Sequence, residues 1–292
     1  MKIEAKSEIL KRSQCHGNLQ QSSIFNMKSS MPMPMRIMLT NDDGIHAPGL
    51  RELDRAFRRA GHQVFVVAPL TEQSAVGHAV TLSLPLRIKQ IQDQSFHGFG
   101  ISGTPVDCVK IGLNTILAPG PDLVVSGINS GANVGVDILY SGTVAAATEA
   151  ALAGIPALAV SIDDFHPADL RAHAECVTRF LERIDPESCP PKRVLNLNFP
   201  GGPLQAVKGL QLCLQTQSVY DDRYEKRTDP RGNEYYWLSG EIPPEELEPG
   251  TDRDLLSQGY ATLTPLRFDF SDRELIAGLE GTWNPELFLQ GD

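Results

Sequence analysis

Short hydrophobic runs alternate along the chain with segments whose hydrophobic residues recur every three or four positions. Runs of about 4 to 8 residues that end in polar turns are typical of strands buried in a parallel sheet. The pattern predicts such strands at MRIMLT (35–40), HQVFVVAP (62–69), DLVVSGI (122–128), PALAVSI (156–162) and VLNLNFP (194–200).

The segments between these runs have helical spacing. In the first of them, Leu50, Leu53, Phe57 and Ala60 recur on one side, and Gly61 follows where a helix-capping glycine belongs. Further helices are predicted over 106–117, 143–154 and about 167–184. Strands that alternate with helices imply right-handed crossovers and an α/β fold with a doubly wound, mostly parallel sheet.

The alternation predicts how the chain is organised. Residues 35–292 form one domain, with a core over about 35–200 and a β-rich extension and tail over about 201–292, where shorter extended pieces and turns replace the helices. Residues 81–91 alternate in a way that indicates an extended, partly exposed excursion. The β-rich extension over about 201–292 is of a kind that is often used for oligomer contacts.

Residues 1–34 differ from the rest and are expected to form a flexible N-terminal extension. They hold five Lys or Arg residues, but no apolar block of the length found in a secretory signal follows them. Translation from one of the later methionines is an alternative explanation for this segment.

Composition and charge narrow the possible functions. The chain has 292 residues, 41% of them hydrophobic, and carries 26 Lys and Arg against 36 Asp and Glu, a net charge of −10. Such a chain has no overall field for wrapping a nucleic acid polymer, so an anionic substrate needs a local binding device such as a metal. The five cysteines are scattered without a CxxC pair, and no apolar stretch approaches the roughly 18 residues of a membrane span. We therefore expect a cytoplasmic protein without a membrane or nucleic acid partner.

Polar residues follow several of the predicted strands. In an open α/β sheet, ligands bind at the carboxyl ends of the strands, near the point where strand order reverses. Adjacent carboxylates at such a point repel one another unless a cation or a proton intervenes, and oxygen ligands suit a hard divalent cation. The alternative for the acidic pair is a helix cap or a solvated turn. The residues concerned are Asn41, Asp42 and Asp43, Ser74, and Asn129 and Asn133.

A second possible binding site lies at the start of the alanine-rich helix predicted over 143–154. Ser141, Gly142 and Thr143 lie where backbone N–H groups are unpaired and the helix dipole is positive, which favours a bound phosphate. The alternative is that Ser141 or Thr143 only caps the helix. A metal site and a phosphate cradle on neighbouring loops together indicate phosphoester chemistry.

Other motifs are excluded. GFGISG (98–103) matches GxGxxG, but Pro105 interrupts the approach to the following helix, and Asp122 opens a strand instead of closing one. The sequence contains no GxxxxGK[ST] loop and no GxSxG elbow. His97 is expected in a turn region, and His46 and His78 are expected to be solvated loop residues near the site.

Several long motifs resemble the SurE family of metal-dependent nucleotidases. They are MRIMLTNDDGIHAPGL (35–50), SGTPVDCVKIGL (102–113), PDLVVSGINSGANVG (121–135), YSGTVAAATEAALAGIPALAVS (140–161), DPRGNEYYWL (229–238) and GYATLTPL (259–266). The resemblance implies a Rossmann-like core and an extended C-terminal region that builds homodimers or homotetramers. It also implies hydrolysis of nucleoside 5′- and 3′-monophosphates. An exopolyphosphatase, another small phosphoester hydrolase and a non-catalytic nucleotide sensor remain as alternatives.

The resemblance also assigns roles to residues. It implies that one divalent cation per subunit, Mg²⁺, Mn²⁺ or similar, is held by Asp42, Asp43, Ser74 and Asn129. Asp42 or Asp43 is then the expected proton acceptor in catalysis. The expected phosphate or substrate contacts are Asn41, Asn133, Ser141, Gly142 and Thr143. The loop LTEQSAVGH (70–78) departs from the family, whose loop is usually richer in small polar or basic residues.

Overall fold

The computed structural model describes residues 34–93, 96–184, 190–243 and 247–280. All but the last residue of the predicted N-terminal extension, 1–34, therefore lies outside the described residues. Within the described ranges, no helix is long and apolar enough to cross a membrane.

A nine-stranded sheet forms the centre of the molecule, with strand order β3-β4-β2-β1-β5-β6-β7-β11-β8. The six strands from β4 to β7 are parallel, while β3 at one side and β11 at the other run antiparallel to their neighbours. The α/β fold with a doubly wound, mostly parallel sheet is thus confirmed. The sheet strands are β1 Arg36–Thr40, β2 Gln63–Pro69, β3 Ile88–Asp93, β4 Phe96–Ile101, β5 Leu123–Ser130, β6 Ala157–Ile162, β7 Arg193–Phe199, β8 Leu210–Leu212 and β11 Ala261–Arg267.

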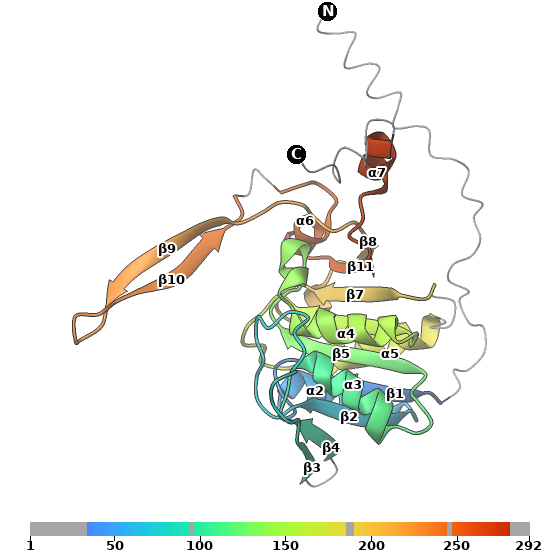
Figure 1. Cartoon of the computed structure of the whole chain (residues 1–292). Coiled ribbons are helices and arrows are strands. Elements are labelled where there is room, and N and C mark those ends of the chain that lie inside the picture. The colour runs from blue at the N-terminus through green and yellow to red at the C-terminus, as the bar shows by residue number, and fades with distance from the viewer. Residues whose placement is uncertain (1–33, 94–95, 185–189, 244–246, 281–292) are drawn as a thin grey trace, which may run out of the picture.

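Helices cover both faces of the sheet (Figure 1). On one face, α2 (Pro48–Arg59) and α5 (Arg171–Arg183) bury Leu53, Phe57 and Val177 in a core cluster. On the other face, α3 (Pro105–Ile111) and α4 (Gly142–Leu152) pack on a second cluster. Nearly all of α4 is buried, and its alanines allow this close packing on the sheet.

The strand order reverses between β1 and β5. From β1 the chain continues outward on one side to β2 and β4, and it then returns to place β5, β6 and β7 on the other side. In Figure 1 the chain enters β1 from the right, so the carboxyl ends of the parallel strands lie on the left. Ligand sites of open α/β sheets lie at this reversal.

Some element predictions need correction. The expectation that His97 lies in a turn region is wrong, because His97 is in β4, and Gly98 and Gly100 of the GxGxxG match are strand residues too. A side chain at Gly100 would begin 2.3 Å from Leu70 Cδ2, so close packing, and not a turn, accounts for that glycine. The helix predicted over 106–117 ends as a π-helical segment, Gly112–Ile116.

The chain after residue 201 is rich in strands, as predicted. Strands β9 (Asp221–Thr228) and β10 (Glu234–Glu241) form a separate antiparallel hairpin that projects from the body of the molecule (Figure 1). Two short helices, α6 (Asp252–Ser257) and α7 (Arg273–Glu280), and the 3₁₀ turns Gly135–Leu139 and Leu204–Ala206 complete the described elements.

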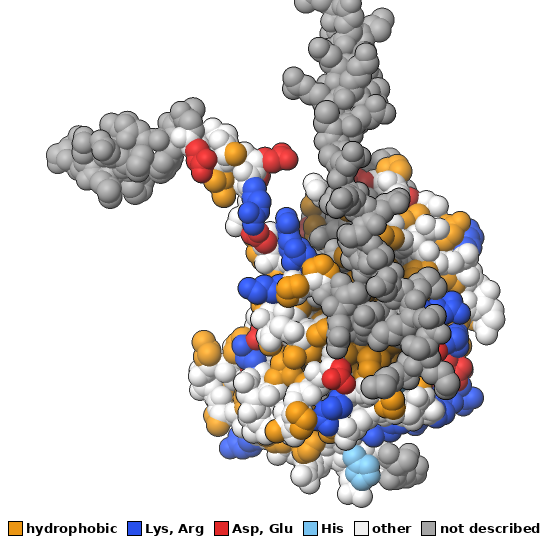
Figure 2. All heavy atoms as spheres, turned by 90° about the vertical axis from the view of Figure 1, so that its right-hand side faces the viewer, with side chains coloured by type: hydrophobic (Ala, Val, Ile, Leu, Met, Phe, Trp, Pro, Cys, Tyr) orange, Lys and Arg blue, Asp and Glu red, His pale blue; other side chains and the backbone are white. Residues whose placement is uncertain are grey.

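The right-hand side of Figure 1 bears the amino-terminal ends of the parallel strands. On this face, Figure 2 shows Lys and Arg side chains scattered among hydrophobic and neutral ones.

Candidate active site

The acidic pair lies directly beyond the end of β1. β1 ends at Thr40, and the turn that follows is held by the Asn41 side chain, whose Nδ2 donates to the Gly44 carbonyl at 2.9 Å. Asn41 is fully buried, and its Oδ1 is without a hydrogen-bond partner. Its side chain thus shapes the turn, and its contact with a substrate stays a prediction.

Asp42 lies against the start of α4. Its carboxylate accepts hydrogen bonds from the Thr143 hydroxyl and from the backbone N–H groups of Gly142 and Thr143. A side chain at Gly142 would begin 2.7 Å from Asp42 Cβ, so only glycine allows this approach. Burial raises the pKa of Asp42 although these hydrogen bonds favour the charged form. The start of α4, which is the predicted phosphate-binding site, is therefore in direct contact with Asp42, which is a predicted metal ligand.

Asp43 is half-buried beside the end of β5. Its Oδ2 accepts the Ser130 N–H at 3.2 Å. Burial, followed by the charges of Asp42 and Glu72, raises the pKa of Asp43 to about 6. The named hydrogen-bond partners of the acidic pair are all neutral, so a divalent cation would relieve the repulsion between the two carboxylates.

An irregularity in β5 positions Asn129. The pairing of β5 with β6 shifts between Ser126 and Asn129. Gly127 has φ +138°, and a side chain there would begin 2.3 Å from the Val160 carbonyl oxygen. Asn129 Nδ2 donates to the Gly131 carbonyl at 2.7 Å, which leaves its Oδ1 as the atom for a cation.

The loop after β2 reaches the same edge of the sheet. Gln73 N donates to the Asp42 carbonyl at 2.8 Å, which places the neighbouring Ser74 beside the pair. Ser74 is exposed, and its Oγ donates to Glu72 Oε1 at 2.6 Å. The charge of Glu72 raises the pKa of Asp43, but Glu72 was not among the predicted site residues, although a carboxylate two residues before Ser74 in a loop after a strand was a usable signal.

The loop between β5 and α4 carries the remaining predicted residues. Asn133 is nearly buried, and its Nδ2 donates to Ser161 Oγ at 2.8 Å, which leaves its second amide hydrogen for a ligand. Ser141 is the N-cap of α4, since its Oγ accepts the Val144 N–H at 3.1 Å. The capping alternative therefore holds for Ser141, whose own hydroxyl hydrogen can still be donated.

The two histidines near the loops are engaged elsewhere. His46 is exposed and its Nδ1 lies 3.1 Å from Arg51, and His78 is exposed and pairs with Glu149 at 3.0 Å. Within the described ranges, no three His, Cys, Asp or Glu side chains gather as a metal cluster. A cation at the acidic pair would thus need neutral oxygen ligands as well, and Ser74 and Asn129 carry such oxygens.

Comparison with known proteins gives a consistent result. The family model described as "Survival protein SurE" matches residues 37–222. A protein named "5'-nucleotidase SurE" from Oleidesulfovibrio alaskensis is 62% identical over 246 residues, covering 84% of this chain and 95% of that protein. Another of the same name, from Nitratidesulfovibrio vulgaris, is 60% identical over 240 residues, covering 82% and 89%.

The solved structures agree. The crystal structure of the SurE protein from Aquifex aeolicus matches with a TM-score of 0.71 and 34% sequence identity, covering 84% of this chain and 98% of that one. The chain belongs to the SurE family.

Proposed function

We propose that this chain is a metal-dependent phosphomonoesterase that hydrolyses nucleoside 5′-monophosphates, and also 3′-monophosphates, to nucleoside and phosphate. The main observation behind this proposal is the pair Asp42 and Asp43, two carboxylates whose pKa values are raised. The pair lies beside the N-terminus of α4, at the point where the strand order reverses. The name of the relatives, "5'-nucleotidase SurE", supports the 5′-nucleotide as the principal substrate.

The oxygen donors of this site fit a hard divalent cation. Asp42, Asp43, Ser74 and Asn129 would hold one such ion per subunit, Mg²⁺, Mn²⁺ or similar. When bound, a cation of this class polarises a phosphate oxygen and lowers the pKa of a nearby water. Burial raises the pKa of both carboxylates, and a bound cation would offset this effect because it favours their charged forms.

The protein's own groups then act on the phosphate and on the water. Asn133 and the Ser141 hydroxyl donate to phosphate oxygens and stabilise the charge that develops on them. Asp42 or Asp43 accepts the proton of the attacking water. Of the two, Asp43 is the less buried and has fewer hydrogen-bond partners, which favours it as the acceptor.

We further propose that the protein is a cytoplasmic homodimer or homotetramer that uses its hairpin. An isolated two-stranded hairpin is at best marginally stable in water. In the described part of the chain β9 and β10 pair only with each other, and Tyr224, Tyr236, Trp237 and Leu238 are each more than half exposed. A second copy would cover these side chains.

The substrate is tested by phosphate release from AMP, GMP, 3′-AMP, ribose 5-phosphate and tripolyphosphate, each with Mn²⁺ and with EDTA. The proposal expects fastest release from a nucleoside 5′-monophosphate, loss of that release in EDTA and recovery with excess Mn²⁺. Fastest release from tripolyphosphate would identify a polyphosphatase instead. Binding of AMP without release from any compound would identify a nucleotide sensor.

A further inference from the structure

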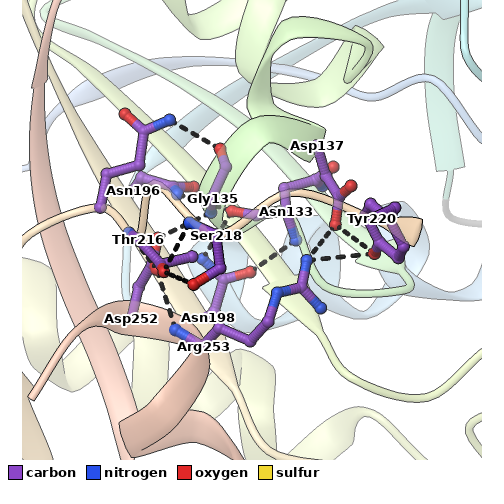
Figure 3. Close-up of polar contacts among 11 residues, drawn as sticks. Asn133, Gly135, Asp137, Asn196, Asn198, Thr216, Ser218, Tyr220, Asp252 and Arg253 are labelled. Carbon is purple, nitrogen blue, oxygen red and sulfur yellow. Dashed lines mark hydrogen bonds and ion pairs between the residues drawn. The ribbon is translucent and has the colours of Figure 1, made fainter. Parts of the chain in front are cut away.

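The loop that carries Asn133 is held by side chains and not by a strand ladder. Figure 3 shows these contacts, which come from β7 and from the C-terminal extension. The backbone N–H and carbonyl groups of Asn133 and Gly135 are all hydrogen-bonded to side chains. The conformation of this loop therefore depends on distant parts of the sequence.

Two asparagines of β7 clamp the backbone of Asn133. Asn198 Oδ1 accepts the Asn133 N–H at 2.8 Å, and Asn198 Nδ2 donates to the Asn133 carbonyl at 3.1 Å. Asn196 Nδ2 donates to the same carbonyl at 2.8 Å. Both asparagines are fully buried, so water does not compete for these bonds.

A buried carboxylate in the C-terminal extension holds the next part of the loop. Asp252, the first residue of α6, accepts the Gly135 N–H at 2.9 Å on Oδ2 and the Thr216 N–H at 2.9 Å on Oδ1. Its side chain is fully buried. Gly135 has φ +55°, and a side chain there would begin 2.6 Å from Thr216 Cγ2, so the two segments are tightly apposed.

A second set of contacts joins the same loop to the base of the hairpin. The Tyr220 hydroxyl, one residue before β9, donates to Asp137 Oδ2 at 3.0 Å. Arg253 pairs with the same carboxylate and also donates to the Tyr220 hydroxyl at 3.1 Å. The segment from Asn133 to Asp137 is thus fixed at both ends by residues outside it.

We propose that Asn196, Asn198 and Asp252 are positioning residues for Asn133, which they hold toward the substrate phosphate without touching the substrate. This inference rests on the proposed function. Both ends of the β5–α4 loop already contact the acidic pair, through Ser130 at Asp43 and through Thr143 at Asp42. A displacement of the intervening residues would therefore move Asn133 relative to a site that is otherwise fixed.

Asp252→Asn tests this arrangement with a small change of shape. Gly135 and Thr216 donate to different oxygens of Asp252, and an amide keeps an acceptor at only one of these two positions, so one N–H would face an NH2 group. We expect kcat/KM for AMP to fall by about 10- to 100-fold, because small displacements of a binding group have effects of this size. The Mn²⁺ concentration that gives half-maximal activity should be unchanged, since no metal ligand moves. Asp254→Asn is the matched control, because Asp254 bonds Gly250 and Gln258 near its own helix and not the loop.

A double-mutant cycle separates positioning from a general structural role. If Asp252 acts through Asn133, the double variant Asn133→Ala/Asp252→Asn should lose no more activity than Asn133→Ala alone. The proposal would be overturned if the activity losses of the two single variants multiplied in the double variant. It would also be overturned if the Asp252→Asn protein were folded and fully active. If Asp252→Asn does not fold, Asn198→Ala takes its place in the same cycle, and its activity losses are interpreted in the same way.

The wild-type protein distinguishes this proposal from the proposed function. If it releases phosphate and the losses multiply, only the positioning role is wrong. If it releases none, the proposed function is wrong, and the same cycle is then measured as the affinity of the Mn²⁺-loaded protein for inorganic phosphate. Coupled losses of that affinity would still support positioning, and independent losses would overturn it.

Discussion

Two adjacent carboxylates are the most informative residues of this chain. The sequence predicts that Asp42 and Asp43 leave a buried strand together, and the structure places them beside Ser130 and the start of α4. The sequence could not show that Asp42 accepts hydrogen bonds from the N–H groups of Gly142 and Thr143, because these residues lie 100 and 101 positions away along the chain. It depends on how α4 packs on the sheet.

Asp43→Asn should abolish most of the metal-dependent turnover. Loss of about 3 kcal/mol of metal-supplied stabilisation corresponds to a decrease in kcat of about 100-fold. The measurement is AMP hydrolysis with saturating Mn²⁺. Asp122→Asn is the matched control, because the exposed Asp122 bonds Arg36 at the opposite edge of the sheet. Near-normal turnover by Asp43→Asn would remove Asp43 from the metal site.

The same variant should be more stable than the wild-type protein when no metal is present. The pKa of Asp43 is raised to about 6 from its ordinary value of 3.8, so the folded state holds the proton more tightly than the unfolded state. Wild-type stability therefore falls as the pH rises between these two values and stays lower above them. Urea unfolding in EDTA at pH 7.5 should give Asp43→Asn the higher midpoint, and a lower midpoint would contradict this explanation of the raised pKa.

At the scale of single elements, the bent end of β5 determines where Asn129 lies. A methyl group at Gly127 would meet the Val160 carbonyl, and φ +138° is unfavourable for other residues. Gly127→Ala should therefore lower the free energy of unfolding by about 1–3 kcal/mol, the usual cost of overpacking, and should weaken Mn²⁺ binding as Asn129 shifts. Denaturant unfolding and metal titration measure the two effects.

Gly120→Ala provides the comparison, because a side chain at Gly120 has open space around it. Equal midpoints and equal metal affinities for the two variants would show that the shape of β5 does not depend on a glycine at 127.

Hydrophobic periodicity predicted the five central parallel strands and failed at β4. Each of the five predicted strands contains at least three Val, Ile, Leu or Met residues, whereas β4 reads FHGFGI, with one such residue and two glycines. These glycines make room for side chains from neighbouring segments, such as Leu70 at Gly100. That requirement belongs to the tertiary packing and has no local signal.

At the scale of the whole molecule, the hairpin predicts self-association. Replacement of Trp237 and Leu238 by Ser should reduce the molar mass measured by sedimentation velocity, because it removes apolar surface from the proposed contact. Leu82→Ser is the control, since Leu82 is highly exposed but lies outside the hairpin. A mass unchanged from that of the wild-type oligomer would show that copies associate through another surface.

Residues that act over long sequence distances were the hardest to predict. The expected ligands lie at or beyond the carboxyl ends of strands, so the topology of an α/β sheet is enough to nominate them. Asn196, Asn198 and Asp252 bond the Asn133 loop from 63 to 117 positions away, counted between the bonded residues. The partner of a polar residue inside a strand, such as Asn196, cannot be identified from a single sequence before the fold is known.

This dependence limits how far the chain can be shortened. The family match ends at residue 222, while Asp252 and Arg253 come later. A truncated protein that stopped at that boundary would retain each proposed metal ligand and yet leave the Gly135 N–H without its acceptor. We therefore expect the smallest active version of this protein to extend beyond residue 222, at least through α6.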